Sequence, residues 1–240
     1  MERRWSDGGF LADGAAPVWP RIVLALFGLV LVVQASWILL AELQRPQRLR
    51  LLGDGKAGTE AALERARDSR LAAKLAIVRG DLWANSAFAH VDVLSRQQAP
   101  AADARSTTVD EARTDLEHAV RYSPHRGDAW LLLAAMADRY RWPGYEPAGL
   151  LKMSYYTAPS DQALFLSRIQ VALRVAGLDD AELADMVGRD IRLLITKTPA
   201  LKPAFLGVYK AASSPGRRFV ERAVSEVDPA YLADLRRSPQ

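Results

Sequence analysis

The sequence predicts an all-α protein in which a single N-terminal transmembrane helix precedes an α-solenoid of paired helices. Three observations lead to this prediction. Residues 22–40 are apolar and carry no charge. Most of the chain after residue 59 repeats apolar or alanine residues at helical spacing. Proline and glycine divide this pattern into segments, and no long run alternates with the period of two that is typical of a strand.

The first predicted element is the membrane anchor, residues 22–40, which read IVLALFGLVLVVQASWILL. At ~1.5 Å per residue this stretch is about 28 Å long, close to the ~30 Å hydrocarbon core of a bilayer. Trp19 and Trp37 lie near its ends, where aromatic rings favour the headgroup level. We therefore expect a transmembrane helix that begins at Ile22 and ends at Leu40, with the lipid bilayer as a partner.

The flanks of this stretch indicate an anchor that is retained. No small-residue cleavage site follows it, so a removable signal peptide is not expected. Basic residues stand on both sides, and by one charge their count favours a cytoplasmic C-terminal side, although long domains can be translocated despite such charges. We expect a single-pass protein of the inner (cytoplasmic) membrane, with residues 1–21 as a short cytoplasmic tail and the C-terminal domain in the periplasm.

Residues 41–58 are predicted to be a linker, because they contain Pro46 and three glycines. Residues 53–58 match the pattern G-x-G-x-x-G. A dinucleotide site would also need a strand before this pattern and a βαβ unit around it, and neither is predicted here. The linker interpretation is therefore preferred.

Residues 59–237 form the predicted helical domain. Helical periodicity covers residues 59–78, 81–96, 110–121, 128–140, 160–175, 180–195, 200–212 and 216–227. Aspartates stand where N-caps are expected, at Asp81, Asp110, Asp128, Asp161 and Asp180. Residues 100–108 are small and polar and are predicted to form an inserted loop.

An internal repeat lies within this domain. Residues 79–83 read RGDLW and residues 126–130 read RGDAW. Both segments open a predicted helix with the aspartate at its cap. An integrin-binding Arg-Gly-Asp site is not expected, since the triplets are explained by helix starts.

Around the second copy, the spacing resembles tetratricopeptide repeats, which alternate small and large residues over two helices and end with proline. Residues 124–159 have nearly the repeat length of that family. The positions assigned to repeat packing are Trp83, Ala112, Leu116, Ala119, Pro124, Trp130, Leu133 and Pro159. This resemblance implies an α-solenoid that binds other proteins, and an irregular helical bundle is the alternative.

A second resemblance covers residues 112–237. The segments 150–156 (LLKMSYY), 190–194 (DIRLL) and 201–204 (LKPA) are similar to a group of bacterial membrane-anchored proteins associated with exopolysaccharide or O-antigen biosynthesis. This resemblance implies a pathway and supplies no mechanism.

The composition excludes several classes of function. The chain has no cysteine, which rules out disulfides, iron–sulfur clusters and thiolate metal sites. A formal net charge of +4 with interspersed carboxylates is unlike a nucleic-acid-binding protein. His90, His118 and His125 form no metal-binding motif, and no nucleophile or acid–base motif is present. We expect no catalytic residue, no cofactor, no metal site and no nucleic-acid partner.

Five aromatic residues, Tyr140, Trp142, Tyr145, Tyr155 and Tyr156, are close together in the sequence. They are predicted either to fill the interface between repeats or to form an interaction surface for a peptide or a sugar. The expected function is a membrane-anchored scaffold or adaptor that holds protein partners in cell-surface polysaccharide biosynthesis or export. The alternatives are a glycan- or peptide-binding module that uses these aromatics and, less favoured, an enzyme acting on lipid-linked sugars.

Overall fold

The computed structural model describes residues 18–43, 58–96, 102–174 and 176–237. Within these ranges every regular element is a helix, which confirms the all-α class. The α-helices are α1 (Val18–Leu43), α2 (Thr59–Leu75), α3 (Gly80–Arg96), α4 (Ala102–Tyr122), α5 (Gly127–Tyr140), α6 (Pro147–Thr157), α7 (Phe165–Ala172), α8 (Ala181–Lys197), α9 (Lys202–Ala211), α10 (Ser214–Ser225) and α11 (Pro229–Arg237). Three short 3₁₀ helices are η1 (Gln162–Leu164), η2 (Ala176–Asp179) and η3 (Pro199–Leu201).

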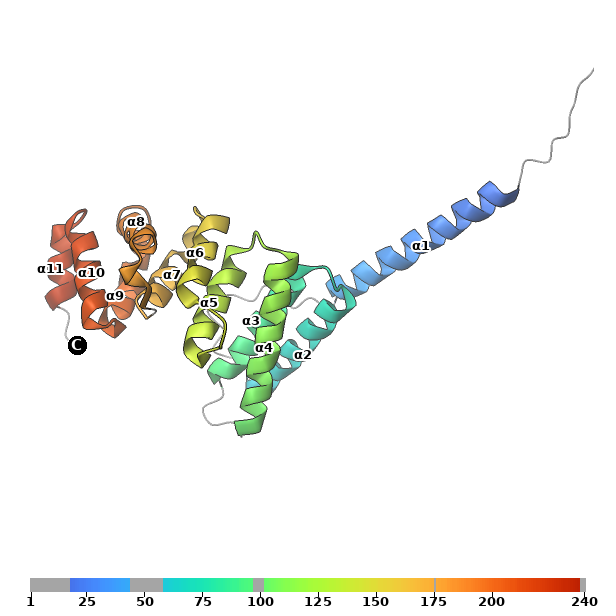
Figure 1. Cartoon of the computed structure of the whole chain (residues 1–240), viewed down its shortest axis with the longest axis horizontal. Coiled ribbons are helices and arrows are strands. Elements are labelled where there is room, and N and C mark those ends of the chain that lie inside the picture. Colours follow the sequence, from blue (N-terminus) through green and yellow to red (C-terminus); the bar gives the residue numbers. More distant parts are fainter. Residues whose placement is uncertain (1–17, 44–57, 97–101, 175, 238–240) are drawn as a thin grey trace, which may run out of the picture.

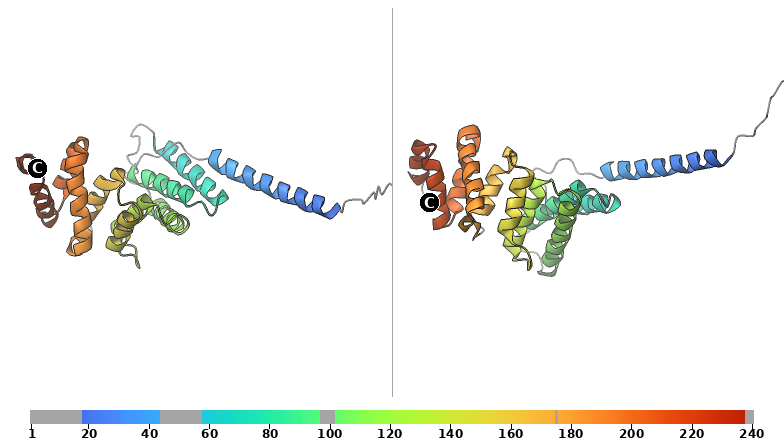
Figure 2. Two further views of the ribbon diagram at one scale, coloured as in Figure 1. Left: turned by 90° about the horizontal axis from the view of Figure 1, so that it is seen from above. Right: turned by 45° about the horizontal axis from the view of Figure 1, so that its top comes forward.

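The helices follow one another along the long axis of the molecule. Figure 1 shows α2–α11 as a row that ends with α10 and α11, while α1 projects from the opposite end. The two further views in Figure 2 show the same succession, so neighbours in sequence are also neighbours in space. The helical part of the molecule is therefore elongated.

The predicted membrane anchor is corrected by the structure. Across the part of the chain that the structure describes, no helix is both long enough and apolar enough to cross a bilayer. The predicted inner-membrane location with a periplasmic C-terminal domain is therefore wrong, and the predicted transmembrane helix over residues 22–40 is not supported.

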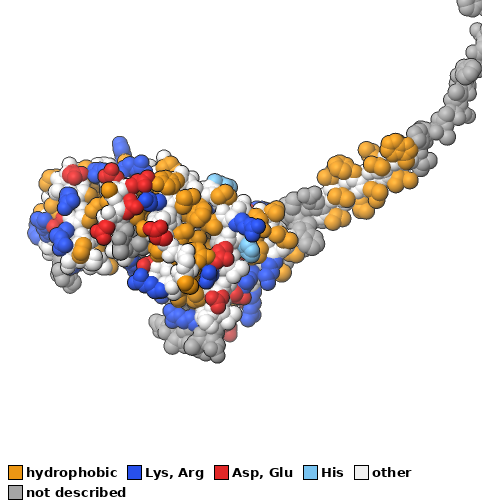
Figure 3. All heavy atoms as spheres, in the orientation of Figure 1, with side chains coloured by type: hydrophobic (Ala, Val, Ile, Leu, Met, Phe, Trp, Pro, Cys, Tyr) orange, Lys and Arg blue, Asp and Glu red, His pale blue; other side chains and the backbone are white. Residues whose placement is uncertain are grey.

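The ends of the predicted anchor are placed as follows. The side chains of Trp19 and Ile22 are exposed, and apolar side chains cover the visible face of α1 (Figure 3). The side chains of Trp37 and Leu40 lie outside the described residues, as do residues 1–17 of the predicted tail. The predicted linker overlaps the end of α1 at residues 41–43, and its G-x-G-x-x-G segment lies outside the described residues up to Gly58, the N-cap of α2.

Several helix boundaries differ from the predicted ones. Helix α4 begins at Ala102, so residues 102–108 belong to its first turns and not to an inserted loop. Helices α6 and α11 were not among the predicted periodic segments, and both are short helices that begin with proline, Pro147 and Pro229.

The predicted caps are confirmed only in part. Asp180 caps α8 by accepting a hydrogen bond from the Leu183 N–H at 3.0 Å, and Asp161 caps η1 in the same way. Asp110 lies in the interior of α4, because that helix starts earlier than predicted. Asp81 and Asp128 lie inside the first turns of α3 and α5, where each carboxylate pairs with an arginine instead of capping the helix.

Candidate functional site

The repeated segment builds the same local structure twice. In the first copy, Arg79 Nε donates to Asp81 Oδ1 at 3.1 Å, and Trp83 Nε1 donates to the Ile77 carbonyl at 2.8 Å. In the second copy, Arg126 Nε donates to Asp128 Oδ1 at 2.9 Å. Trp130 Nε1 donates to the Pro124 carbonyl, also at 2.8 Å. Each unit thus fixes the chain that enters a helix at both the arginine and the tryptophan.

The glycine of each copy lets one helix start against the end of the next helix. A Cβ atom on Gly80 would lie 2.5 Å from Ser123 Oγ and 2.6 Å from Ser123 N, just after α4. A Cβ atom on Gly127 would lie 2.6 Å from the Cβ atom of Ala158, just after α6. Only glycine allows this approach without a shift, so α3–α4 and α5–α6 close in the same manner.

The units are also joined to each other. Arg126 Nη1 donates to the Asp81 carbonyl at 3.3 Å, so the second copy is tied to the first. In the following step, the buried guanidinium of Arg168 from α7 donates to the Ser154 and Ala158 carbonyls at 2.5 and 2.9 Å. An arginine therefore binds the backbone of the preceding pair at both junctions.

The residues assigned to repeat packing lie where helices meet. Ala112, Leu116 and Ala119 of α4 are fully buried, and Leu133 of α5 packs in the same cluster as Leu116. The remaining four are Trp83, which is buried, Trp130, which is half-buried, and Pro124 and Pro159, which are exposed and follow the ends of α4 and α6.

The five aromatic residues do not share one surface. Trp142 and Tyr155 are buried, with 8% and 1% of their surface exposed, while Tyr156 is 52% exposed. Tyr140 and Tyr145 are half-buried against Trp142, with ring centroids 6.3 and 5.9 Å from its own. Trp142 and Tyr155 therefore fill the interior and offer little surface to a partner.

The rings around Trp142 are fixed by charged side chains of α4. The Arg113 guanidinium carbon lies 5.7 Å from the Trp142 ring centroid and 5.1 Å from that of Tyr145. Glu117 accepts hydrogen bonds from Arg113 Nε at 2.9 Å and from the Tyr145 hydroxyl. This arrangement holds the α5–α6 loop against α4.

A second group of charges lies between α2, α3 and α4. His90 is buried, with Nε2 at 3.2 Å from Glu111 Oε2 and Nδ1 at 3.2 Å from Asp115 Oδ2. Ser86 Oγ donates to Asp115 at 2.6 Å, and Arg70 pairs with Glu111. Among the described residues, no group of histidines and carboxylates is arranged to hold a metal ion.

The other two histidines, His118 and His125, lie outside this group of charges. The His118 ring lies between Trp83 and Tyr122, with centroids at 4.5 and 5.9 Å, and His125 is exposed after α4. His118 therefore serves packing within the first unit.

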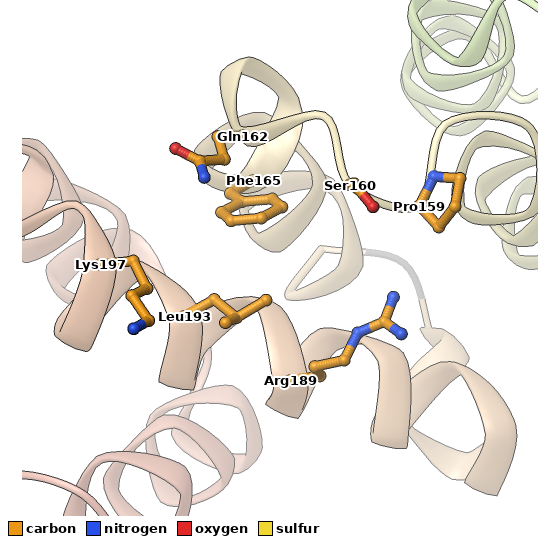
Figure 4. A pocket seen from close by; sticks show the side chains of 7 residues that line it. All are labelled: Pro159, Ser160, Gln162, Phe165, Arg189, Leu193 and Lys197. Atoms are coloured by element: carbon orange, nitrogen blue, oxygen red, sulfur yellow. The ribbon is translucent and has the colours of Figure 1, made fainter.

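A hollow of about 220 Å³ lies between the α6–α7 connection and α8 (Figure 4). Phe165, at the start of α7, and Leu193 of α8 form its apolar floor. The other residues that line it are Pro159, Ser160, Gln162, Arg189 and Lys197. In Figure 4 the side chains of Arg189, Leu193 and Lys197 follow one another along one face of α8, and the Phe165 ring faces Leu193.

The two cations of this hollow differ from most cations around them. Three neighbouring cations each form an ion pair with a carboxylate. The pairs are Arg192–Glu226 at 3.1 Å, Lys152–Asp180 at 2.6 Å and Lys202–Asp228 at 2.9 Å. By contrast, Arg189 and Lys197 are exposed and form no side-chain ion pair or hydrogen bond with another described residue. The hollow therefore presents two available positive charges on either side of an apolar floor.

A buried charge lies beneath the same stretch of α8. Asp190 is fully buried, and burial raises the pKa of its carboxyl group to about 6, although the nearby Arg168 opposes this rise. The guanidinium carbon of Arg168 lies 4.6 Å from the Tyr155 ring centroid. Burial also raises the pKa of the Tyr155 hydroxyl. These three groups belong to the interior of the molecule.

None of the residues that line the hollow was a predicted site residue except Pro159, which was assigned to packing. The spacing of Arg189, Leu193 and Lys197 places all three on one helical face, and this signal was available in the sequence. Phe165, across the hollow, could be found only from the fold. Comparison with known proteins adds no relative, because no family model, no curated protein and no solved structure matches the chain.

Proposed function

We propose that this protein is a non-enzymatic scaffold of tetratricopeptide-like helix pairs that holds other proteins together. The observation that carries the proposal is the repeated geometry of residues 79–83 and 126–130. In both copies an Arg–Asp pair and a Trp-to-carbonyl hydrogen bond fix the chain that enters a helix, and a glycine brings that helix start close to the end of the following helix. Stacked helix pairs with this kind of regular junction form extended surfaces that bind partners.

The burial of aromatic residues supports a protein partner over a glycan. Stacking on sugar rings needs exposed aromatic faces, and Trp142 and Tyr155 are buried. Only Tyr156 presents a largely exposed ring among the five, and its hydroxyl donates to Glu182 at 2.7 Å. The proposal therefore rests on the helical surface as a whole and not on an aromatic platform.

The proposed setting is cell-surface polysaccharide biosynthesis or export. Its support is the similarity of residues 112–237 to proteins associated with exopolysaccharide or O-antigen biosynthesis. In this setting the scaffold would hold two or more proteins of the assembly in contact. An adaptor of this kind needs no catalytic residue of its own.

The test is to remove residues 59–237 from the chromosomal copy and to measure the amount and length of exported polysaccharide. We expect less polymer or shorter polymer, and full recovery when the complete chain is supplied from a plasmid. The matched control is a plasmid that encodes the complete chain with Gly207→Ala, which should also restore the polymer. Gly207 is exposed, and an added methyl group meets no atom within 4 Å. An unchanged polymer in the deletion strain would contradict the proposed setting.

A second measurement tests the scaffold itself. A photoreactive amino acid in place of Tyr156, which is exposed, should crosslink to the same partner proteins in repeated experiments. The same substitution at Phe205, which is fully buried, should give no crosslink and serves as the control. A purified chain that hydrolyses or transfers lipid-linked sugars, without crosslinked partners, would contradict the scaffold proposal.

A further inference from the structure

The hollow between the α6–α7 connection and α8 combines apolar and positively charged side chains in a defined order. Its floor is apolar, at Phe165 and Leu193, and a cation stands on each side, at Arg189 and Lys197. Its volume of about 220 Å³ is below the range of about 300–1,000 Å³ that is usual for small-molecule and cofactor pockets. A hollow of this size suits one apolar side chain of a longer ligand.

The spacing of the three α8 residues that line the hollow indicates the backbone conformation of its ligand. Arg189, Leu193 and Lys197 are each four residues apart, so along the helix each step is about 6 Å and the two cations are about 12 Å apart. In an extended peptide, alternate side chains point to the same face and are about 6.6 Å apart. Three alternate side chains of an extended peptide therefore match these three positions one by one.

We propose that this hollow binds an extended acidic segment of a partner protein with the pattern acidic–x–apolar–x–acidic. The apolar side chain would enter the hollow between Phe165 and Leu193. The two carboxylates would pair with Arg189 and Lys197, which have no other side-chain ion pair among the described residues. This inference rests on the proposed function, since it names the chemistry of one partner of the scaffold.

The apolar floor distinguishes a peptide from other anions. Phe165 lines the hollow with only 2% of its surface exposed, so half-buried Leu193 offers most of the apolar surface that a partner's side chain would cover. An acidic polysaccharide would satisfy the cations but would place no aliphatic side chain against Phe165 and Leu193. Burial of apolar surface and two exposed ion pairs would act together only for a peptide of the proposed pattern.

The experiment measures binding of the full chain to a fluorescein-labelled synthetic peptide, Gly-Thr-Glu-Thr-Leu-Thr-Glu-Thr-Gly, by fluorescence polarisation. We expect saturable binding that weakens as salt is added, because the ion pairs are exposed. The double variant Arg189→Glu/Lys197→Glu should weaken binding roughly tenfold. The matched control, Lys210→Glu/Arg218→Glu, changes the same net charge at exposed positions outside the hollow and should leave binding unchanged.

Two further arms test the geometry. A peptide with the same composition but with both glutamates adjacent to the leucine should bind more weakly, because its acidic side chains point to the opposite face. The charge-reversed double variant should bind a peptide with lysine in place of both glutamates better than the unmodified chain does. Weakening in the first arm and this gain in the second would support the pattern.

Three results would overturn the inference. The first is no binding of the acidic peptide, and the second is equal binding of that peptide by the unmodified chain and by the Arg189→Glu/Lys197→Glu variant. The third is that an acidic polysaccharide such as polygalacturonate displaces the labelled peptide as well as the unlabelled peptide does. Crosslinking through Tyr156 does not depend on the hollow. If partners are still captured there while the peptide fails to bind, the inference fails and the proposed function stands. If no partner is captured and the deletion leaves the polymer unchanged, the proposed function fails.

Discussion

Helices α2–α5 bury many alanines, alongside a third cluster of larger side chains around Leu116 and Leu133, whereas helices α7–α10 pack mainly through leucine, isoleucine, valine and phenylalanine. In the first region, the buried residues of two small clusters include Ala72, Ala73, Ala84, Ala119 and Ala129, and Ala62, Ala66 and Ala89. In the second region, one larger cluster includes Leu183, Val187, Ile191, Leu194, Phe205 and Val220. Small side chains let helix axes approach closely, while large ones keep them apart and fill the space between.

This difference explains where the hollow lies. The first region repeats one junction, and its glycines and alanines leave little space between helices. The second region contains short 3₁₀ helices and several shorter α-helices, and the irregular α6–α7 connection, with Pro159, Ser160 and Gln162, lies beside α8. Regular stacking therefore gives the molecule its length, and the irregular junction gives it a place for a side chain.

The largest expected effect comes from removing a large side chain in the second region. Phe205→Ala should lower the free energy of unfolding by about 3–5 kcal/mol, because Phe205 is fully buried and its loss leaves a cavity. Urea unfolding would measure this as a lower midpoint with an unchanged slope. The control Leu71→Ala removes an exposed apolar side chain of α2 and should cost less than about 1 kcal/mol. Equal effects would remove the distinction between core and surface in this comparison.

The next effect depends on pH and concerns Asp190. Burial raises its pKa from 3.8 to about 6 in the folded chain, so between these values the folded state binds more protons than the unfolded state. The stability that this carboxyl group contributes is therefore present below pH 3.8 and is lost as pH rises through 6, by roughly 3 kcal/mol in total. Asp190→Asn should avoid this loss.

Urea unfolding between pH 4 and pH 7.5 would measure the difference between Asp190→Asn and the unmodified chain. We expect the variant to gain in relative stability as pH rises, with the change complete near pH 7. Asp185→Asn, on the exposed side of α8, is the matched control because it makes the same chemical change at an exposed position. A difference that stays constant with pH would show that Asp190 keeps its ordinary titration in the folded chain.

The third effect tests the close packing of the first region. Gly80→Ala should destabilise the chain by about 1–3 kcal/mol, because the new methyl group would meet Ser123 N at 2.6 Å and the helices must separate. Gly207→Ala makes the same chemical change in α9, where nothing lies within 4 Å, and should stabilise the chain by about 0.5–1 kcal/mol. The opposite signs would appear as opposite shifts in melting temperature, and a shared sign would contradict the packing difference.

The part of the structure that could be predicted depends on contacts between nearby residues in the chain. The Arg–Asp pairs join residues two apart, and the tryptophans bond to carbonyl groups six residues earlier, so the repeated segment had a local signature. Most helices were predicted from periodicity for the same reason. The start of α4 was missed because its first turns are small and polar, although Thr108 and Val109 are buried.

The hollow could not be predicted, because it depends on residues far apart in the chain. Phe165 and Leu193 face each other only after α7 and α8 have packed. The sequence also placed Trp142 and Tyr155 in a possible binding surface, since aromatic residues suit both interiors and interfaces. Only the positions of neighbouring helices determine which of the two applies.

The smallest expected effect compares the two copies of the repeat directly. Trp83→Phe and Trp130→Phe each remove an indole N–H that donates to a backbone carbonyl at 2.8 Å, so each should cost about 0.5–1.5 kcal/mol. The loss should be greater at Trp83, which is 6% exposed, than at half-buried Trp130, because water can replace the lost donor only where it reaches the carbonyl. Urea unfolding of both variants would measure the two costs. If only one of the two variants lowered the free energy of unfolding, the two junctions would share a geometry but not a stabilising role. The repeated hydrogen bond would then describe only the course of the backbone.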